Sequence, residues 1–134
     1  MKDSELLALL QLHVFNAVQD SFVPTLPIAY VDTAFRVPAD KKWLEILRAT
    51  NNQSPFLSTG TVYAGSVRLL LHWPKDGGGA KEPMELAESI AGYFFKSRMM
   101  DGIKIEQQAL TSDSVKTDTD ILYPITFRYR HLTD

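Results

Sequence analysis

The chain has 134 residues, of which 45% are hydrophobic and 22% are charged. This mixture is that of an ordinary globular domain, and it excludes a chain that is disordered throughout. Fourteen basic and sixteen acidic side chains give a net charge of −2, and there are no cysteines. The sequence therefore excludes disulfide scaffolds, cysteine-ligated metals and thiol nucleophiles, and it lacks the basic excess of a nucleic-acid-binding protein.

The length fits one domain, and we predict that residues 1–134 form a single soluble domain. The amino-terminus lacks the basic start and the small-residue cleavage site of a signal peptide. No apolar stretch approaches the roughly 18 residues that a membrane-spanning helix requires. There is no internal repeat, so neither a second domain nor a membrane location is expected.

The first predicted element is a helix over residues 4–20. Leu9, Leu12 and Phe15 lie away from its main core-facing stripe, so this helix is apolar on more than one side. We therefore expect it either to be sandwiched in the core or to meet another subunit. The core-facing stripe consists of Leu6, Leu7, Leu10, Val14, Ala17 and Val18.

Alternating apolar residues predict strands, most clearly over residues 62–73 and 121–131. Pro124 cannot donate a hydrogen bond to a neighbouring strand, so the second of these strands is expected at a sheet edge or at a bulge. Shorter strands are predicted at residues 28–31, 43–49 and 102–110. Polar composition with proline or glycine predicts long loops at residues 50–61, 74–83 and 111–120.

A second helix is predicted from about residue 82 to residue 96, and Pro83 suits its first turn. Its predicted core-facing residues are Met84, Ala87, Ile90, Ala91, Phe94 and Phe95. This order of elements favours an α+β fold, with a mixed, largely antiparallel sheet and two helices packed on one face.

The histidines and glycines form no recognisable catalytic or binding motif. His13, His72 and His131 lie in three different predicted elements and lack metal-ligand spacing, so structural roles are expected for His13 and His131. The run Gly77–Gly79 is not a phosphate loop, because no Gly-Lys-Ser or Gly-Lys-Thr follows it. No catalytic residue, metal or cofactor is therefore predicted.

The charged residues of the last third of the chain leave two alternatives open. Asp113, Asp118 and Asp120 lack the glycine and the terminal glutamate of a calcium loop, and they form either a weak divalent-cation site or a solvated loop. Arg128 and Arg130 share one strand face, where they either recognise an anion or are simply solvated. We take these two arginines as candidate polar contacts.

Several segments in a fixed order carry a resemblance to a known family. The segment LPIAYVDTAFRVPADKKWLEI combines a short strand, an acidic turn and a Trp-led strand, and TGTVYAGSVRLLLHWPKDGGG follows it. The helix with Ala87, Ile90 and Phe94 comes next, and LYPITFRYR lies near the carboxyl end. In order and overall length, this pattern resembles the tail-terminator (tail-completion) proteins of long-tailed bacteriophages over nearly the whole chain.

The resemblance implies a small α+β subunit that forms a ring, typically six-fold, on the end of the finished tail tube. Such a ring stops further polymerisation and offers a surface to the neck of the capsid. The implied partners are other copies of the chain, the tail tube protein and a head-completion or neck protein. The implied location is the head-proximal end of the tail in the virion, after assembly in the host cytoplasm, and the family contributes no catalytic residues.

A ring that closes head-to-tail needs two different complementary patches on each subunit. Leu12 is the strongest candidate for such a patch, because it projects among polar residues of its helix. For each candidate, the alternative is ordinary core packing. The predicted interface residues are Leu9, Leu12, Phe15 and Phe56.

Two other functions remain open at the level of sequence. One is a different neck component, such as a head-closure or connector subunit. The other is a small enzyme or ligand-binding domain that uses Arg128, Arg130 and the aspartates of residues 113–120.

Overall fold

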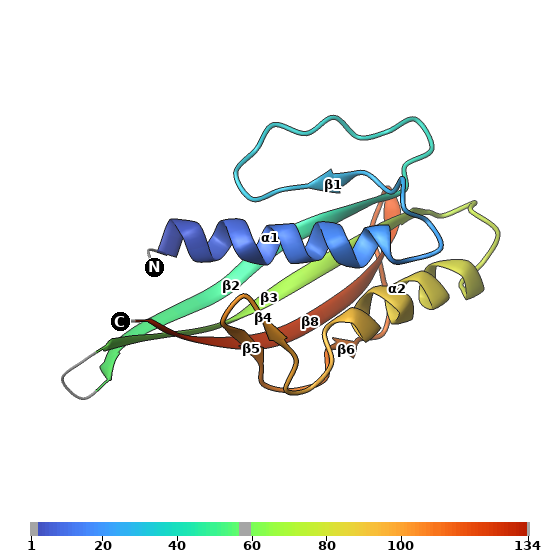
Figure 1. Cartoon of the computed structure of the whole chain (residues 1–134). Coiled ribbons are helices and arrows are strands. Elements are labelled where there is room, and N and C mark those ends of the chain that lie inside the picture. Colours follow the sequence, from blue (N-terminus) through green and yellow to red (C-terminus); the bar gives the residue numbers. More distant parts are fainter. Residues whose placement is uncertain (1–2, 57–59, 134) are drawn as a thin grey trace.

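The computed structural model describes the backbone of residues 3–56 and 60–133, and the side chains of residues 3–48 and 63–131. In this part of the chain, α1 (Asp3–Gln19) and α2 (Lys81–Tyr93) lie on one face of an eight-stranded sheet (Figure 1). The strands are β1 (Ile28–Ala29), β2 (Trp43–Phe56), β3 (Gly60–Pro74), β4 (Met99–Met100), β5 (Ile103–Ile105), β6 (Leu110–Thr111), β7 (Val115–Lys116) and β8 (Asp120–Thr133).

The strand order is β1-β2-β3-β8-β5-β4, and β6 and β7 also pair with β8. The β1–β2 pair is parallel, and the other described pairs are antiparallel. The predicted α+β class, with a mixed and largely antiparallel sheet under two helices, is therefore confirmed.

β3 and β8 form the centre of the sheet, and their pairing is unbroken from Thr61 opposite Thr133 to Pro74 opposite Asp120. Directly opposite residues of antiparallel strands share a face of the sheet, so alternate residues of both strands face the helices. The alternation predicted for residues 62–73 and 121–131 is confirmed by burial. The buried residues of this face are Tyr63, Val67, Leu69, Leu71 and Trp73 on β3, and Tyr123, Ile125, Phe127 and Tyr129 on β8.

The predicted loop over residues 50–61 is wrong, because β2 runs to Phe56 and β3 begins at Gly60. The antiparallel pairing continues through this polar segment, since backbone hydrogen bonds form whatever the side chains are. Pro55 has no N–H to donate, but β1 pairs with β2 only near Leu44, which leaves this end of β2 at an edge of the described sheet. The result is a long hairpin that runs past the helices (Figure 1).

The expectation that Pro124 marks an edge or a bulge is also wrong. β8 lies between β3 on one side and β5, β6 and β7 on the other, and its pairing with β3 has no interruption. The Pro124 carbonyl accepts a hydrogen bond of 3.0 Å from the Ser112 N–H, just after β6 ends. The nitrogen of Pro124 points to the same side, into the gap between β6 and β7, so no ladder bond is lost there.

The segment between α2 and β8 folds into shorter pieces than predicted. The strand expected over residues 102–110 is reduced to β5, which forms a tight hairpin with β4 through Asp101 and Gly102, both at positive φ. The polar segment 111–120 is not only a loop, because it contains β7 and begins within β6, and both pair with β8. Each of these strands pairs with only two or three residues of β8.

The helices start close to their predicted positions, but α2 ends early. Phe94 has φ −101° and ψ 67°, outside the helical region, so α2 stops at Tyr93 rather than at residue 96. Phe94 consequently turns into the core and is fully buried. Met84, predicted to face the core, is 50% exposed, because the buried side of α2 runs from Pro83 through Leu86 to Ile90. Phe95, also predicted to face the core, is 47% exposed, because it lies beyond the end of α2.

His13 joins α1 to the end of α2 and to the β4–β5 turn. Its Nε2 lies 2.8 Å from Asp101 Oδ2, and its Nδ1 lies 3.0 Å from the Tyr93 hydroxyl. Both ring nitrogens of this nearly buried histidine are thus occupied by side chains of other elements. This geometry supports the structural role that the sequence predicts for His13.

Candidate assembly interface

The exposed side of α1 carries apolar residues that the sequence singles out. Leu12 is 49% exposed and Phe15 is 41% exposed. Ala8, one turn before Leu12, is also exposed, and the spacing of four and three residues places all three on one side of the helix. We call these residues the α1 stripe. Neighbouring exposed apolar side chains mark contact surfaces, and full burial of a Leu or Phe side chain stabilises a contact by about 1.5–3 kcal/mol.

The other two predicted interface residues are placed differently. Leu9 is half-buried and packs against the hydrophobic core beneath α1. Phe56 is the last residue of β2, and its side chain lies outside the described residues. The structure therefore brings Leu12 and Phe15 together on the surface and places Leu9 largely inside the fold.

In the described part of the chain, both helices lie on the same face of the sheet (Figure 1), and we call the opposite face the bare face. Arg128 and Arg130 alternate along β8 and both point to this face, where both are exposed. Arg68 of β3 lies opposite Thr126 of β8, and Lys104 of β5 lies opposite Arg130 of β8. The bare face therefore carries four exposed cations, which we call the basic band: Arg68, Lys104, Arg128 and Arg130.

One carboxylate belongs to the basic band. The Glu106 Oε1 lies 3.6 Å from the Arg130 Nε, and the Arg130 side chain is 60% exposed. A surface ion pair of this kind contributes about 0–1 kcal/mol, so it fixes the Arg130 side chain only weakly. The basic band keeps an excess of positive charge.

Exposed apolar residues flank the basic band on the same face. Leu47 of β2 lies opposite Arg68 and is 39% exposed, and Leu110 of β6 lies opposite Thr126 and is 63% exposed. Val115 of β7 is also exposed. Protein interfaces combine arginines with apolar side chains in this way, so the bare face has the composition of a contact surface.

An open groove borders the bare face at its β2 edge. It has a volume of about 520 Å³ and lies between the segment 29–37 and β2. Tyr30, Phe35 and Val37 line one side, and Leu47 lines the other. The groove extends the apolar part of the bare face toward β1.

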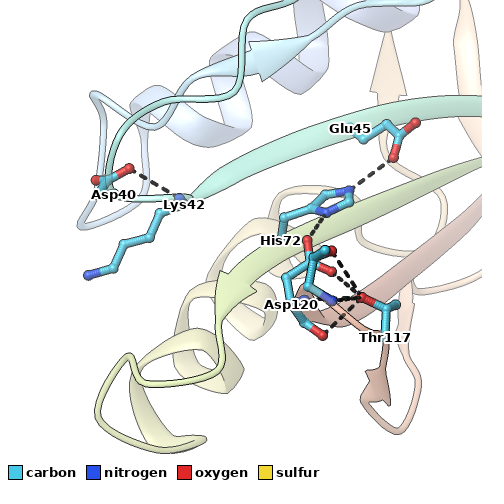
Figure 2. Close-up of polar contacts among 7 residues, drawn as sticks. Asp40, Lys42, Glu45, His72, Thr117 and Asp120 are labelled. Carbon is cyan, nitrogen blue, oxygen red and sulfur yellow. Dashed lines mark hydrogen bonds and ion pairs between the residues drawn. The ribbon is translucent and has the colours of Figure 1, made fainter.

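His72 is the centre of a polar cluster that connects three strands at one end of the bare face (Figure 2). Its Nδ1 lies 2.6 Å from Asp120 Oδ2 on β8, and its Nε2 lies 3.0 Å from Glu45 Oε1 on β2. Trp43 stacks on the imidazole, with ring centroids 3.7 Å apart, and Phe35 stacks on Trp43 at 4.9 Å. The cluster fastens β2, β3 and the start of β8 together.

Asp120 is held as a carboxylate by this cluster. Burial opposes its ionisation, but hydrogen bonds from Thr117 and His72, together with the positive charges of His72 and Lys75, hold the pKa of Asp120 below its ordinary value of 3.8. The Thr117 hydroxyl donates to Asp120 Oδ1 over 2.7 Å, and the Thr117 Oγ1 accepts from the Asp120 N–H over 3.1 Å. The turn before β8 is thus built around the Asp120 carboxylate.

We expect Asp120→Asn to lower the free energy of unfolding at neutral pH by about 1.5–3 kcal/mol, because hydrogen bonds to a charged group are lost. A lowered pKa stabilises the fold above the unfolded-state value, and this stabilisation disappears as the pH falls through the folded-state pKa. The difference between wild type and variant should therefore shrink below about pH 4 in urea unfolding series. Asp118→Asn, an exposed neighbour on the same turn, is the control. A difference that stays constant from pH 7 to pH 3 would refute this role.

The aspartates do not assemble into a cation site in the part of the chain that the structure describes. Asp120 faces His72, Asp113 borders a surface hollow near Met84, and Asp118 is exposed. Among the described residues, no three His, Asp or Glu side chains are placed to share a metal ion. Sequence reasoning missed the His72 cluster because Glu45, His72 and Asp120 meet only through the strand register, and no local motif marks them.

The sheet and the helices on one of its faces define a two-layer α+β subunit, and comparison with known proteins identifies its family. The family model described as phage tail terminator protein matches residues 5–129, nearly the whole chain. The chain belongs to the phage tail terminator protein family. It is therefore a structural protein of a phage tail that interacts with other tail components, and its place is the virion.

Solved structures share the fold. Thirteen chains match, and one of them superimposes with a TM-score of 0.72 at 18% sequence identity, covering 97% of this chain and 95% of its own length. At this level of identity, the likeness shows a common fold alone. No curated protein matches the chain at the sequence level. Neither described helix is long and apolar enough to cross a bilayer.

Proposed function

We propose that this chain caps the finished tail tube as a closed ring of six copies, stops further addition of tube subunits, and forms the interface to the head. Membership of the tail terminator family over residues 5–129 is the observation that carries this proposal. The partners are then other copies of the chain, the tail tube protein and a head-completion or neck protein. The position is the head-proximal end of the tail.

The distribution of contact surfaces supports a ring. A head-to-tail ring closes only when each subunit has two different patches that fit each other. The α1 stripe lies on the helical side of the subunit, and the basic band with its apolar neighbours lies on the bare face. Two unlike surfaces on opposite sides of one small subunit suit head-to-tail association.

A ring contact of this kind involves no chemical reaction, and the chain acts by geometry alone. One side of the ring fits the tube end, and the other side lacks the surface to which a further tube subunit would add. The proposal therefore assigns the chain no catalytic role.

The mass in solution tests the proposal. Six copies of the 15.1 kDa chain give a particle of about 90 kDa, in equilibrium with the monomer at low concentration. Sedimentation velocity should resolve this species, and purified tail tubes should bind it at one end. A strictly monomeric protein that also fails to bind tail tubes would contradict the proposal.

A further inference from the structure

The helical face carries an acidic surface, which we call the acidic ridge. Glu82, Glu85 and Glu88 are exposed along α2, on the side away from the sheet. Asp113 is exposed in the segment between β6 and β7, next to the same helix. Lys81 lies 4.0 Å from Glu85, but this pair is largely exposed and contributes little. The acidic ridge therefore keeps most of its negative charge.

A hollow with a mixed lining lies beside the acidic ridge. It has a volume of about 300 Å³ and lies between α2 and the segment after β6, where Met84 and Tyr123 meet the polar residues Thr111, Ser112, Asp113 and Ser114. Glu88 borders an adjoining smaller hollow that Met84 and Tyr123 also line. The Met84 side chain remains half exposed in the folded subunit. Methionine is among the residues enriched at protein interfaces, so this exposed side chain fits a contact surface.

The acidic ridge and the basic band are complementary but lie on opposite faces of the sheet. They cannot meet within one copy, because the sheet separates them (Figure 1). Two copies stacked in the same orientation bring the bare face of one against the helical face of the next.

We propose that the basic band of one copy packs against the acidic ridge of the next copy, with the α1 stripe covering the apolar part of the same bare face. This inference rests on the proposed function, because it assigns the contact between neighbouring subunits of that ring. The charges select the orientation in which copies join, since like faces repel and unlike faces attract. The apolar residues supply the buried area.

A second copy suits the bare face better than a nucleic acid does. The basic band contains only four cations, and Glu106 lies among them, which would repel phosphates. The residues beside the band, Leu110 and Val115, are aliphatic, and Trp43 at one end of the bare face is already stacked on His72 and contacted by Phe35. The acidic ridge, in contrast, supplies the required charge within the same chain.

Charge reversal tests this contact directly. The band variant carries Arg68→Glu and Arg128→Glu, and the ridge variant carries Glu85→Arg and Glu88→Arg. All four residues are exposed, so both variants should fold, which circular dichroism checks. Each variant alone should self-associate at least tenfold more weakly than wild type in sedimentation equilibrium. Lys96→Glu, a reversal at an exposed position outside both surfaces and outside the groove, is the control.

An equimolar mixture of the two variants should recover association to within about threefold of wild type. In an alternating ring, a reversed band meets a reversed ridge, and a native band meets a native ridge. Variants that assemble like wild type, or a mixture that fails to recover, would overturn the inference. So would a band variant that loses only its binding to a 30-base-pair DNA duplex while it still self-associates.

The outcomes separate this contact from the proposed function. If the band variant still caps tail tubes as a ring, the subunit contact lies elsewhere and the terminator role survives. If wild-type chains do not self-associate, alone or on tube ends, both proposals fail.

Discussion

Replacing Leu12 and Phe15 together with glutamate is expected to leave a folded monomer that no longer caps tail tubes. Both side chains are largely exposed in the isolated subunit, so the variant keeps its core. In the ring, each would be covered by a neighbouring copy, and a buried glutamate without a partner is strongly unfavourable. Because about half of each side chain is exposed before assembly, the loss of the two apolar contacts alone corresponds to about 1.5–3 kcal/mol for each interface.

The measurement is sedimentation velocity together with thermal unfolding. The variant should sediment as a 15.1 kDa species at concentrations where wild type is associated, with a melting temperature within a few degrees of the isolated wild-type subunit. Ser4→Glu is the control for added charge alone, because Ser4 is exposed at the start of α1, two turns before Leu12. If the double variant still forms rings, the α1 stripe is not part of the subunit interface.

The second large effect is expected from Phe94→Ala in the core. Phe94 is fully buried and stacks on Phe127, with ring centroids 4.1 Å apart and planes 9° apart. Truncation of a buried Phe costs about 3–5 kcal/mol through lost transfer energy and the cavity left behind. A domain of this size is stable by only about 5–15 kcal/mol, so the melting temperature should fall by roughly 10–20 °C.

The neighbouring Phe95 provides the control for this substitution. Phe95 is 47% exposed, and its ring lies 5.1 Å from the Arg98 guanidinium carbon. Phe95→Ala should cost about 1 kcal/mol or less, because little burial and one exposed cation–π contact are lost. Equal losses from the two substitutions, measured by urea unfolding, would contradict the placement of Phe94 in the core.

The sequence predicts the centre of this fold well because periodicity reports burial. In β3 and β8, apolar and polar residues alternate, and the structure buries the apolar set against the helices. The same pattern identified most of the buried side of α1. Where a face of an element meets the core, the pattern of side chains is sufficient to place it.

Periodicity fails where the backbone or a distant residue determines the outcome. The end of β2 is polar yet remains a strand, because backbone pairing with β3 does not depend on side-chain polarity. A continuing helix would place both Phe94 and Phe95 toward the core. Because α2 ends at Tyr93, Phe94 is buried and Phe95 is exposed. The acidic ridge includes Asp113, which only the pairing of β6 with β8 brings beside α2.

The length of tails assembled without this chain tests the central claim most directly. Electron microscopy of phage lysates should reveal tails of variable and excessive length when the chain is missing. Normal length should return when wild-type protein is supplied, but not with the Leu12 and Phe15 double variant. Tails of normal length beside leaking capsids would point to a head-closure role, and normal virions would contradict the terminator role altogether.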